Sequence, residues 1–320
     1  MAYRYVFGPV RSGRLGRSLG LDLLGERLCS MDCVYCEVGP TRTKTLARST
    51  PVPARAILSE LAAWRDEGAD PPDAVSLGGL GEPSLSLAMA EVIEGARALL
   101  PGVAVAVLTN ASLMDDPAVR RDLALADVVL PSLDSLVEAE FAGINRPCPG
   151  LTAAGVARGI LEFRKEFTGK IFLEILLAKG YNDTDENLGR LRDFCRRLTP
   201  DRVDVVTLTR PGTVRGVGPV DGATLNRWRM ALGAGVAPDS ARGASGRRRL
   251  SRQGAAEQVR ASLARRPQTL AQLAEGLTAD PELVRRAVAA LVEAGAVVSC
   301  QEQGETFYHG SDRPDRDETP

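Results

Sequence analysis

Short apolar segments alternate with amphipathic segments from Ser18 to about Gly235. The apolar segments are bounded by Gly, Pro, Asn or Asp, as is typical of buried parallel strands. They predict six strands: Leu19–Leu24, Ala74–Leu77, Val103–Thr109, Asp127–Leu133, Lys170–Ala178 and Val203–Leu208. Apolar residues at helical spacing between them predict helices at Pro53–Glu67, Leu85–Leu100, Ala153–Phe167 and Asp185–Leu198. Repeated strand-helix units favour a parallel sheet covered by helices, and six of them predict an α/β fold of the partial (βα)6 TIM-like barrel type. Functional side chains then gather at the carboxyl ends of the strands.

The periodicity stops after Gly235. Residues 236–254 are rich in Gly, Ser and Arg and predict a flexible basic linker. Helical patterns at Ala255–Arg265, Thr269–Leu277 and Pro281–Ala294 precede two short strands around a Gln-Gly turn. This order predicts a small winged-helix domain. We therefore divide the chain into a barrel (1–235), the linker (236–254), the winged-helix domain (255–310) and a disordered tail (311–320).

The charge and the apolar content exclude some classes of partner. The formal net charge of the 320 residues is -1, so binding to nucleic acid would need a local basic patch. No apolar run is long enough to span a membrane, and the first residues lack the apolar region of a signal peptide. We expect a cytoplasmic protein whose thiols stay reduced.

Three of the six cysteines lie together, directly after the first predicted strand. They have the spacing C-x3-C-x2-C and are Cys29, Cys33 and Cys36. Idle buried thiols rarely crowd onto one loop, and zinc requires four ligands, usually in two pairs. The other candidate ligands are scattered: Cys148, Cys195, Cys300 and His309. Three thiolates without a fourth ligand suit an iron-sulfur cluster with one iron open to a small molecule.

Polar groups and glycines follow the other predicted strands. The second strand runs into SLGGLGEPSL (76–85), where glycines permit a close backbone approach and carbonyls or a carboxylate can receive an ammonium group. Such a turn alone is weak evidence of a site. The ends of the later strands carry Asn110, Ser132, Asp134, Glu174 and Arg210. Asn110 and Asp134 have the alternative role of capping the turn or helix that follows.

The cysteine spacing, with Tyr35 before the last cysteine, resembles the C-x3-C-x-Φ-C signature of the radical S-adenosylmethionine (radical SAM) superfamily. The resemblance implies a [4Fe-4S] cluster on Cys29, Cys33 and Cys36, with SAM chelating the fourth iron. Reductive cleavage would give methionine and a 5'-deoxyadenosyl radical that abstracts hydrogen from a substrate, with flavodoxin or ferredoxin as the electron donor. It also implies that contacts to SAM or substrate come from Gly79, Gly81, Glu82, Pro83, Asn110, Ser132, Asp134, Glu174 and Arg210.

Several short motifs within residues 6–215 resemble one particular group of the superfamily. CVYCEVGPT, GLGEPSL, INRP (144–147) and RPG (210–212) are similar to iron-sulfur oxidoreductases allied to the tRNA wyosine-base synthases. The segment RSGRLG departs from that pattern, which expects a Pro and a second Arg.

The substrate stays open, with RNA base modification nearest by resemblance. Activation of a glycyl-radical enzyme and a redox-sensing DNA-binding regulator are the alternatives. The winged-helix domain would dock a protein or a nucleic acid, and Cys148, in NRPCPG, is a weak candidate for a catalytic thiol.

Overall fold

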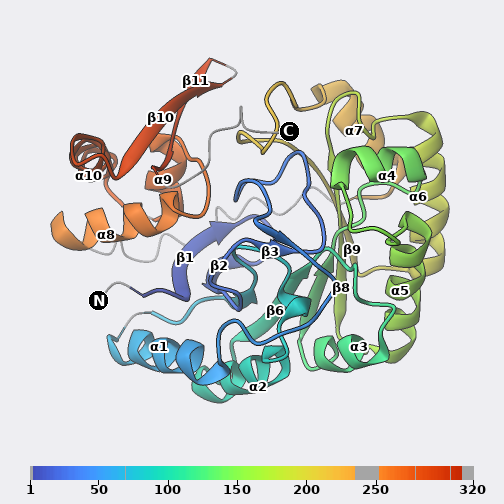
Figure 1. Ribbon diagram of the computed structural model, residues 1–320, viewed down its shortest axis with the longest axis horizontal. Coiled ribbons are helices and arrows are strands. Elements are labelled where there is room, and N and C mark those ends of the chain that lie inside the picture. Colours follow the sequence, from blue (N-terminus) through green and yellow to red (C-terminus); the bar gives the residue numbers. More distant parts are fainter. Residues whose placement is uncertain (1–2, 69, 235–251, 278, 303, 312–320) are drawn as a thin grey trace.

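A seven-stranded sheet is the centre of the fold in the computed structural model (Figure 1). The structure describes residues 3–68, 70–234, 252–277, 279–302 and 304–311. The sheet has the order β1-β2-β5-β6-β7-β8-β9, in which β1 is antiparallel to β2 and the other neighbours are parallel. Its strands are β1 Val6–Ser12, β2 Gly16–Leu21, β5 Ala74–Leu77, β6 Ala104–Thr109, β7 Val128–Pro131, β8 Lys170–Leu177 and β9 Arg202–Thr207.

All six predicted strands are present, within a few residues of the predicted ends. The sequence patterns missed β1, because Gly8 and Pro9 interrupt its apolar residues. The pairing of β1 with β2 shifts register between Phe7 and Val10. Proline has no backbone N–H to donate, so a strand that contains it is tolerated at a sheet edge, where β1 lies.

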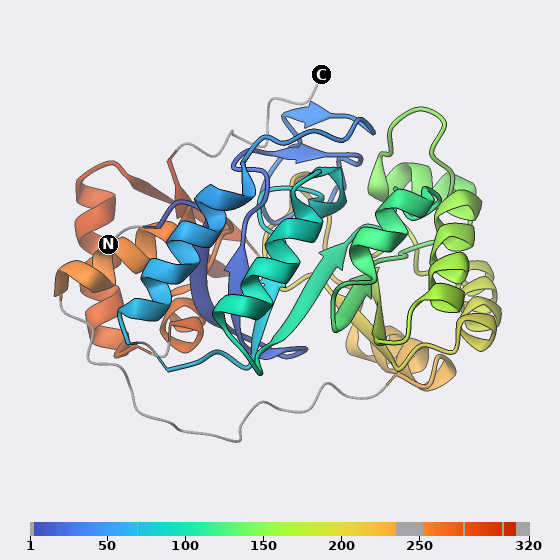
Figure 2. The same ribbon diagram turned by 90° about the horizontal axis from the view of Figure 1, so that it is seen from below.

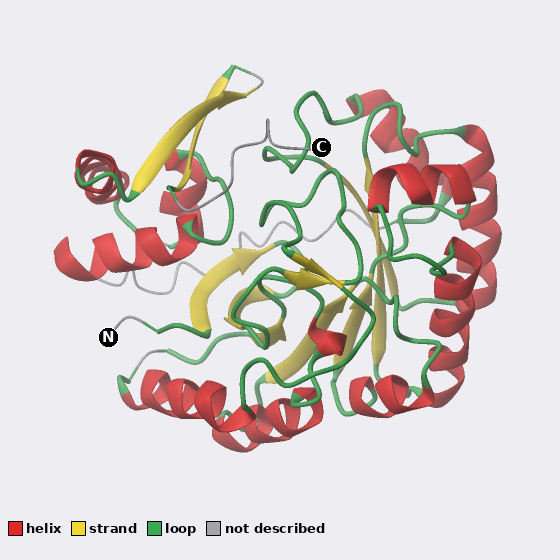
Figure 3. Ribbon diagram, viewed as in Figure 1, coloured by secondary structure: helices red, strands yellow, loops and turns green. Residues whose placement is uncertain are grey.

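Helices follow the parallel strands and cover one face of the sheet (Figure 3). They are α1 Ala54–Asp66, α2 Met89–Leu99, α3 Pro117–Leu123, α4 Glu138–Asn145, α5 Ala153–Glu166, α6 Asp185–Leu198 and α7 Gly222–Ala231. The helix α2 begins later than predicted because Pro83–Leu85 forms a separate 3-10 turn, η1, capped by Glu82. No helix in the described ranges is long and apolar enough to cross a membrane.

The two faces of the sheet differ in chemistry. Outward residues such as Leu19, Val75 and Ile175 belong to the main apolar core with the helices. The inner face carries polar residues, including Ser18 and Ser76, whose hydroxyls lie 2.8 Å apart. Polar residues on these strands are stable here because this part of the inner face lines a cavity.

The turn between β1 and β2 reaches across this inner face. Leu15 packs with Leu108, Leu130 and Phe172. The guanidinium of Arg202, on the far edge strand β9, lies 3.4 Å from the carbonyl oxygen of Arg14. The two edges of the sheet therefore approach each other, and the sheet is curved (Figure 2).

A separate module follows, with its own small apolar core around Val259, Leu273 and Val284. Its elements are α8 Arg252–Leu263, α9 Leu270–Gly276, α10 Pro281–Glu293 and the hairpin β10 Val297–Glu302 with β11 Glu305–Gly310. Three helices and a hairpin occur in the predicted order, and the winged-helix assignment stays a prediction. The helix α8 begins at Arg252, inside the predicted linker. Residues 235–251 and 312–320 lie outside the described residues.

The module packs on β1, at the edge of the sheet (Figure 1). The guanidinium carbon of Arg265 lies 4.2 Å from the centre of the Phe7 ring, and Nη2 donates to the carbonyl oxygen of Arg4 (3.1 Å). Gln272 reaches the carbonyl oxygen of Thr209, just beyond β9. The module thus contacts segments near both edges of the curved sheet.

Candidate active site

The loop after β2 places the three clustered cysteines at the carboxyl end of the sheet. Cys29 lies in the short strand β3 (Leu28–Cys29), which pairs with β4 (Thr43–Lys44). The backbone N–H of Cys36 donates to the carbonyl oxygen of Cys33 (3.1 Å). All three side chains are half-buried. This is the position at which we predicted the ligands of a cluster.

Distant segments hold this cysteine loop through backbone hydrogen bonds. The N–H of Val34 donates to the carbonyl oxygen of Ile144 (2.9 Å), and Cys148 donates to Ser30 (2.9 Å). The N–H of Thr213 donates to Val34 (3.0 Å). The INRP and RPG segments, which carried part of the resemblance, therefore meet at the loop. Their spacing along the chain gave no indication of this contact.

Two glycines are required where other segments touch the loop. A Cβ atom on Gly81 would lie 1.8 Å from the carbonyl oxygen of Leu28, beside Cys29. A Cβ on Gly212 would lie 2.6 Å from the Cα of Tyr35. Both distances are far below van der Waals contact, so only glycine permits the backbones to approach. The GEP and RPG motifs thereby help to shape the cysteine loop.

Burial makes the isolated thiols poor thiolates. Desolvation, followed by the nearby charge of Glu82, raises the pKa of Cys29 to about 12. Burial also raises the pKa of Cys33 well above its usual value, and its thiolate would be repelled by Cys36 and Cys29. Three adjacent, half-buried thiols therefore call for a positively charged occupant that stabilises their thiolates.

The chemistry of the three cysteines fits a cluster in which each thiolate binds a different iron. In the part of the chain that the structure describes, no three His, Cys, Asp or Glu side chains are arranged to hold one metal ion. A tetrahedral zinc site with Zn–S bonds of about 2.3 Å would hold its sulfurs about 3.8 Å apart. A cluster binds each thiolate through a different iron and accepts a wider spacing. The donor set of three cysteines thus fits an iron-sulfur cluster.

Two side-chain amides reach the cysteine sulfurs. Nδ2 of Asn110 lies 3.5 Å from Sγ of Cys29 and 2.9 Å from Oγ of Ser30. Nδ2 of Asn145 lies 3.4 Å from Sγ of Cys33. Asn110 was predicted as a SAM contact, whereas the structure places its amide beside a cysteine. Asn145 was missed, and its place in the INRP phrase was the only signal for it.

We expect Asn110→Ala to lower the reduction potential of the bound cluster. Hydrogen bonds to the ligand sulfurs stabilise the more negative, reduced state, so their loss disfavours reduction. Potentiometric titration of the reconstituted protein measures the shift. Asn226→Ala, at an exposed position on α7, is the control and leaves the potential unchanged. An unchanged potential in Asn110→Ala would show that this hydrogen bond does not act on the cluster.

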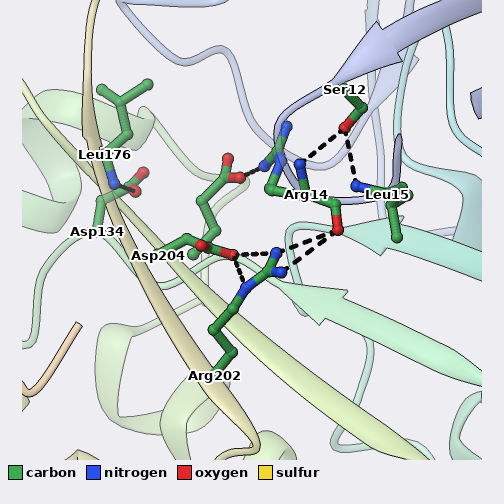
Figure 4. A network of polar contacts seen from close by, with 8 residues as sticks. Ser12, Arg14, Leu15, Asp134, Leu176, Arg202 and Asp204 are labelled. Carbon is green, nitrogen blue, oxygen red and sulfur yellow. Dashed lines mark hydrogen bonds and ion pairs between the residues drawn. The ribbon is translucent and has the colours of Figure 1, made fainter. Parts of the chain in front are cut away.

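Asp134 holds the cysteine loop through hydrogen bonds. Its Oδ2 accepts hydrogen bonds from the hydroxyl of Tyr35 (2.5 Å) and from Nδ2 of Asn145 (2.8 Å). Its Oδ1 accepts from the N–H of Leu176 in β8 (2.9 Å), a contact drawn in Figure 4. Burial raises the pKa of Asp134. Asp134 therefore connects Tyr35, inside the cysteine motif, to β8.

Both oxygens of the Glu82 carboxylate accept hydrogen bonds from the protein. Oε1 accepts from the N–H of Ser84 (3.0 Å) and from Oγ1 of Thr109 (2.7 Å), and Oε2 accepts from the N–H of Asn110 (2.7 Å). The side chain is 2% exposed, and Pro83 begins the 3-10 turn beside it. Glu82 thus joins the Gly-rich turn to the end of β6.

The remaining predicted residues lie along the inner face or its rim. Ser132 forms a β-bridge with Glu174. Glu174 pairs with Arg14, a residue of the atypical RSGRLG segment. Arg210 pairs with Glu37, just after the cysteines (3.2 Å).

Cys148 lies beside the cysteine loop, where its backbone N–H donates to the carbonyl oxygen of Ser30 (2.9 Å). It is 6% exposed and does not line the cavity between the inner face of the sheet and α8.

A cavity of about 810 Å³ lies between the inner face, the β1–β2 turn and α8. Its volume is in the range of small-molecule sites. It reaches Gly78 and Gly79 at the end of β5.

Gly79 has φ of 151°, which favours glycine. Gly78 has no positive φ, and a Cβ there would meet only Leu108 Cβ, at 3.6 Å. Neither packing nor backbone conformation therefore requires a glycine at this position.

The comparisons with known proteins agree with this site. Residues 27–192 of the 320 match the model of the Radical SAM superfamily. The chain is 37% identical over 207 residues to "UPF0026 protein slr1464" of Synechocystis sp., covering 64% of this chain and 76% of that protein. A "UPF0026 protein" of Helicobacter pylori is 33% identical over 212 residues, covering 66% of this chain and 68% of that protein.

Solved structures agree on the fold. SuiB of Streptococcus suis bound to its precursor peptide SuiA has a TM-score of 0.51 and 20% identity, covering 67% of this chain and 45% of that chain. The chain thus spans less than half of SuiB, and the likeness concerns the fold alone. The family match includes the cysteine loop and four of the six parallel strands of the sheet, β5 to β8. Members of this superfamily are enzymes that use an iron-sulfur cluster and SAM. The protein belongs to the radical SAM superfamily.

Proposed function

We propose that the protein is a radical SAM oxidoreductase with a [4Fe-4S] cluster on Cys29, Cys33 and Cys36. The observation that carries the proposal is the meeting of these three cysteines with the Gly-rich turn at one end of the sheet. When bound, the cluster and SAM would supply reductive cleavage of SAM to methionine and a 5'-deoxyadenosyl radical that abstracts hydrogen from a substrate. Flavodoxin or ferredoxin is the proposed electron donor.

The residues of the chain would bind, orient and shield these groups. Asn110 and Asn145 donate toward the cysteine sulfurs, and Gly81 and Gly212 permit the loop to be enclosed. Gly78 and Gly79 would let SAM approach the backbone. Contact of the β1–β2 turn with β9 closes one end of the sheet, and an enclosed site keeps water from a reactive species.

Anaerobic reconstitution tests the proposal. The protein is loaded with iron and sulfide, reduced with dithionite and given SAM, and 5'-deoxyadenosine and methionine are measured. Formation of both products in equal amounts supports the proposal. A reconstituted, reducible cluster that never cleaves SAM, with dithionite or with reduced flavodoxin, contradicts it.

We expect Gly78→Val to weaken SAM binding while leaving the fold stable. A valine side chain would occupy cavity space beside Leu108 without meeting the backbone. Loss of a close contact of this kind costs about 1–3 kcal/mol, or roughly 5- to 150-fold in affinity. SAM affinity and urea unfolding are measured together. The control Gly218→Val, where the added atom meets nothing within 4 Å, leaves affinity unchanged. Equal SAM affinities in the two variants would place the cofactor elsewhere.

The substrate class implied by the resemblance stays a prediction. RNA base modification, activation of a glycyl-radical enzyme and redox-sensing DNA binding each lack a specific observation in their favour. In α10, the third helix of the module, Arg285 and Arg286 both pair with Glu282, which reduces their attraction for phosphates.

A further inference from the structure

One wall of the cavity is positively charged. Four arginines line it, and they are Arg14, Arg210, Arg265 and Arg266. Arg14 and Arg210 come from the barrel, at the β1–β2 turn and beyond β9. The other two follow α8, in the C-terminal module. The wall is thus built from two parts of the chain that meet only in the tertiary structure.

Most of these guanidinium groups have protein partners, but Arg266 does not. Arg14 pairs with Glu174, Arg210 with Glu37, and Arg265 donates to a backbone carbonyl. Arg266 is half-buried and makes no hydrogen bond or ion pair within the described residues. Nε of Arg210 is also buried without a hydrogen-bond partner. Arg266 therefore keeps its donors available on the side of the cavity formed by the C-terminal module.

The local charge is positive. Arg266 lies close enough to Arg210 and Arg14 that their charges, after burial, lower its pKa, and Glu37 offsets them only in part. Arg202 and Asp204 neutralise each other beside Arg14 (Figure 4). Among the charged side chains that interact with one another at this wall, the positive charges outnumber the negative charges by one. These side chains are Arg14, Arg202, Arg210, Arg266, Glu37, Glu174 and Asp204. A buried excess charge is costly unless an anion balances it.

The cavity's other carboxylates do not balance this wall. Glu67 accepts a hydrogen bond from the Tyr3 hydroxyl. Glu257 lies on α8, and Glu37 is the one carboxylate among the charges of described residues that shift the pKa of Arg266. The cavity also extends to Gly78 and Gly79, so one small molecule could contact both the arginines and the space beside the Gly-rich turn.

We propose that Arg14, Arg210 and Arg266 form an anion subsite for the substrate, a small molecule with a phosphate or carboxylate group. Arginine is suited to this role because its planar guanidinium binds both groups through paired hydrogen bonds. The C-terminal module then acts as part of the substrate site, because it supplies Arg266. The identification of the anion as a substrate rests on the proposed radical SAM function. Binding of an anion to the subsite can be tested without that function.

Calorimetric titration of the full chain, with its cluster reconstituted, tests the subsite. The probes are inorganic phosphate, inorganic pyrophosphate and malonate at constant ionic strength. We expect at least one to bind, and Arg266→Gln to weaken it roughly 10- to 100-fold through loss of a charged hydrogen bond. Arg266→Lys retains the charge and part of the affinity. Arg285→Gln, on the exposed face of α10, leaves binding unchanged. Preference for the phosphates or for malonate identifies the anionic group.

Three results would overturn the proposal. The first is that no probe binds, or that Arg266→Gln binds the probes as the wild type does. The second is that Arg266→Gln weakens SAM instead of the probes, which would assign Arg266 to the cofactor. The third is Arg266-dependent binding of a single-stranded RNA oligonucleotide without binding of any small anion. Arg266-dependent anion binding in a protein that never cleaves SAM would contradict the proposed function alone.

Discussion

Cys33→Ser is expected to abolish retention of the cluster and, with it, cleavage of SAM. Serine has nearly the same volume, but its hydroxyl is a poor ligand for iron and stays protonated. Because loss of an outer-shell partner already costs 10- to 100-fold, loss of a ligand should reduce 5'-deoxyadenosine formation by more than about 100-fold. Iron and sulfide content after gel filtration, together with product formation, measure the effect.

Cys195→Ser is the matched control. Cys195 lies on α6, partly buried against the main core, and its raised pKa of about 11 results from burial alone. We expect this variant to lose some stability but to retain its iron and its activity. Full iron content in Cys33→Ser would show that the cluster has other ligands. Equal loss of iron in both variants would indicate a general effect of serine on folding.

Gly81→Ala is expected to destabilise the protein and to displace the cysteine loop. The added Cβ would lie 1.8 Å from the carbonyl oxygen of Leu28, and this backbone atom cannot rotate away as a side chain could. Overpacking of this kind costs about 3 kcal/mol. Because Leu28 immediately precedes Cys29, relief of the clash must move the first ligand. Urea unfolding of the apo chain and iron content after reconstitution measure the two effects separately.

Gly189→Ala makes the same chemical change where nothing lies within 4 Å of the added atom. It lies inside α6, where alanine is favoured over glycine by about 0.5–1 kcal/mol. This control should be slightly more stable than the wild type and should bind a full cluster. If Gly81→Ala unfolded at the same urea concentration as Gly189→Ala, the approach of the turn to β3 would be looser than the structure has it.

Local sequence patterns were sufficient for the parallel strands and the longer helices. Their apolar residues recur with a fixed period, and a buried segment such as Ala74–Leu77 can be recognised from its own residues. The strand β1 was missed because Gly8 and Pro9 hide its period. The helices α3, α4 and α7 were missed because each is short and has little periodic pattern.

The sequence by itself determined the three clustered cysteines and their position after a strand, because both depend on neighbours in the chain. It did not determine that Asn145 reaches Cys33 or that the Glu82 carboxylate accepts hydrogen bonds from Thr109 and Asn110. Nor did it determine that Arg266 lines the cavity. Those contacts join residues far apart in the chain, and their distances are set only when the sheet curves and the C-terminal module packs on β1. The three clustered cysteines were therefore recognisable from the sequence, whereas the groups that surround them were decided by the tertiary structure.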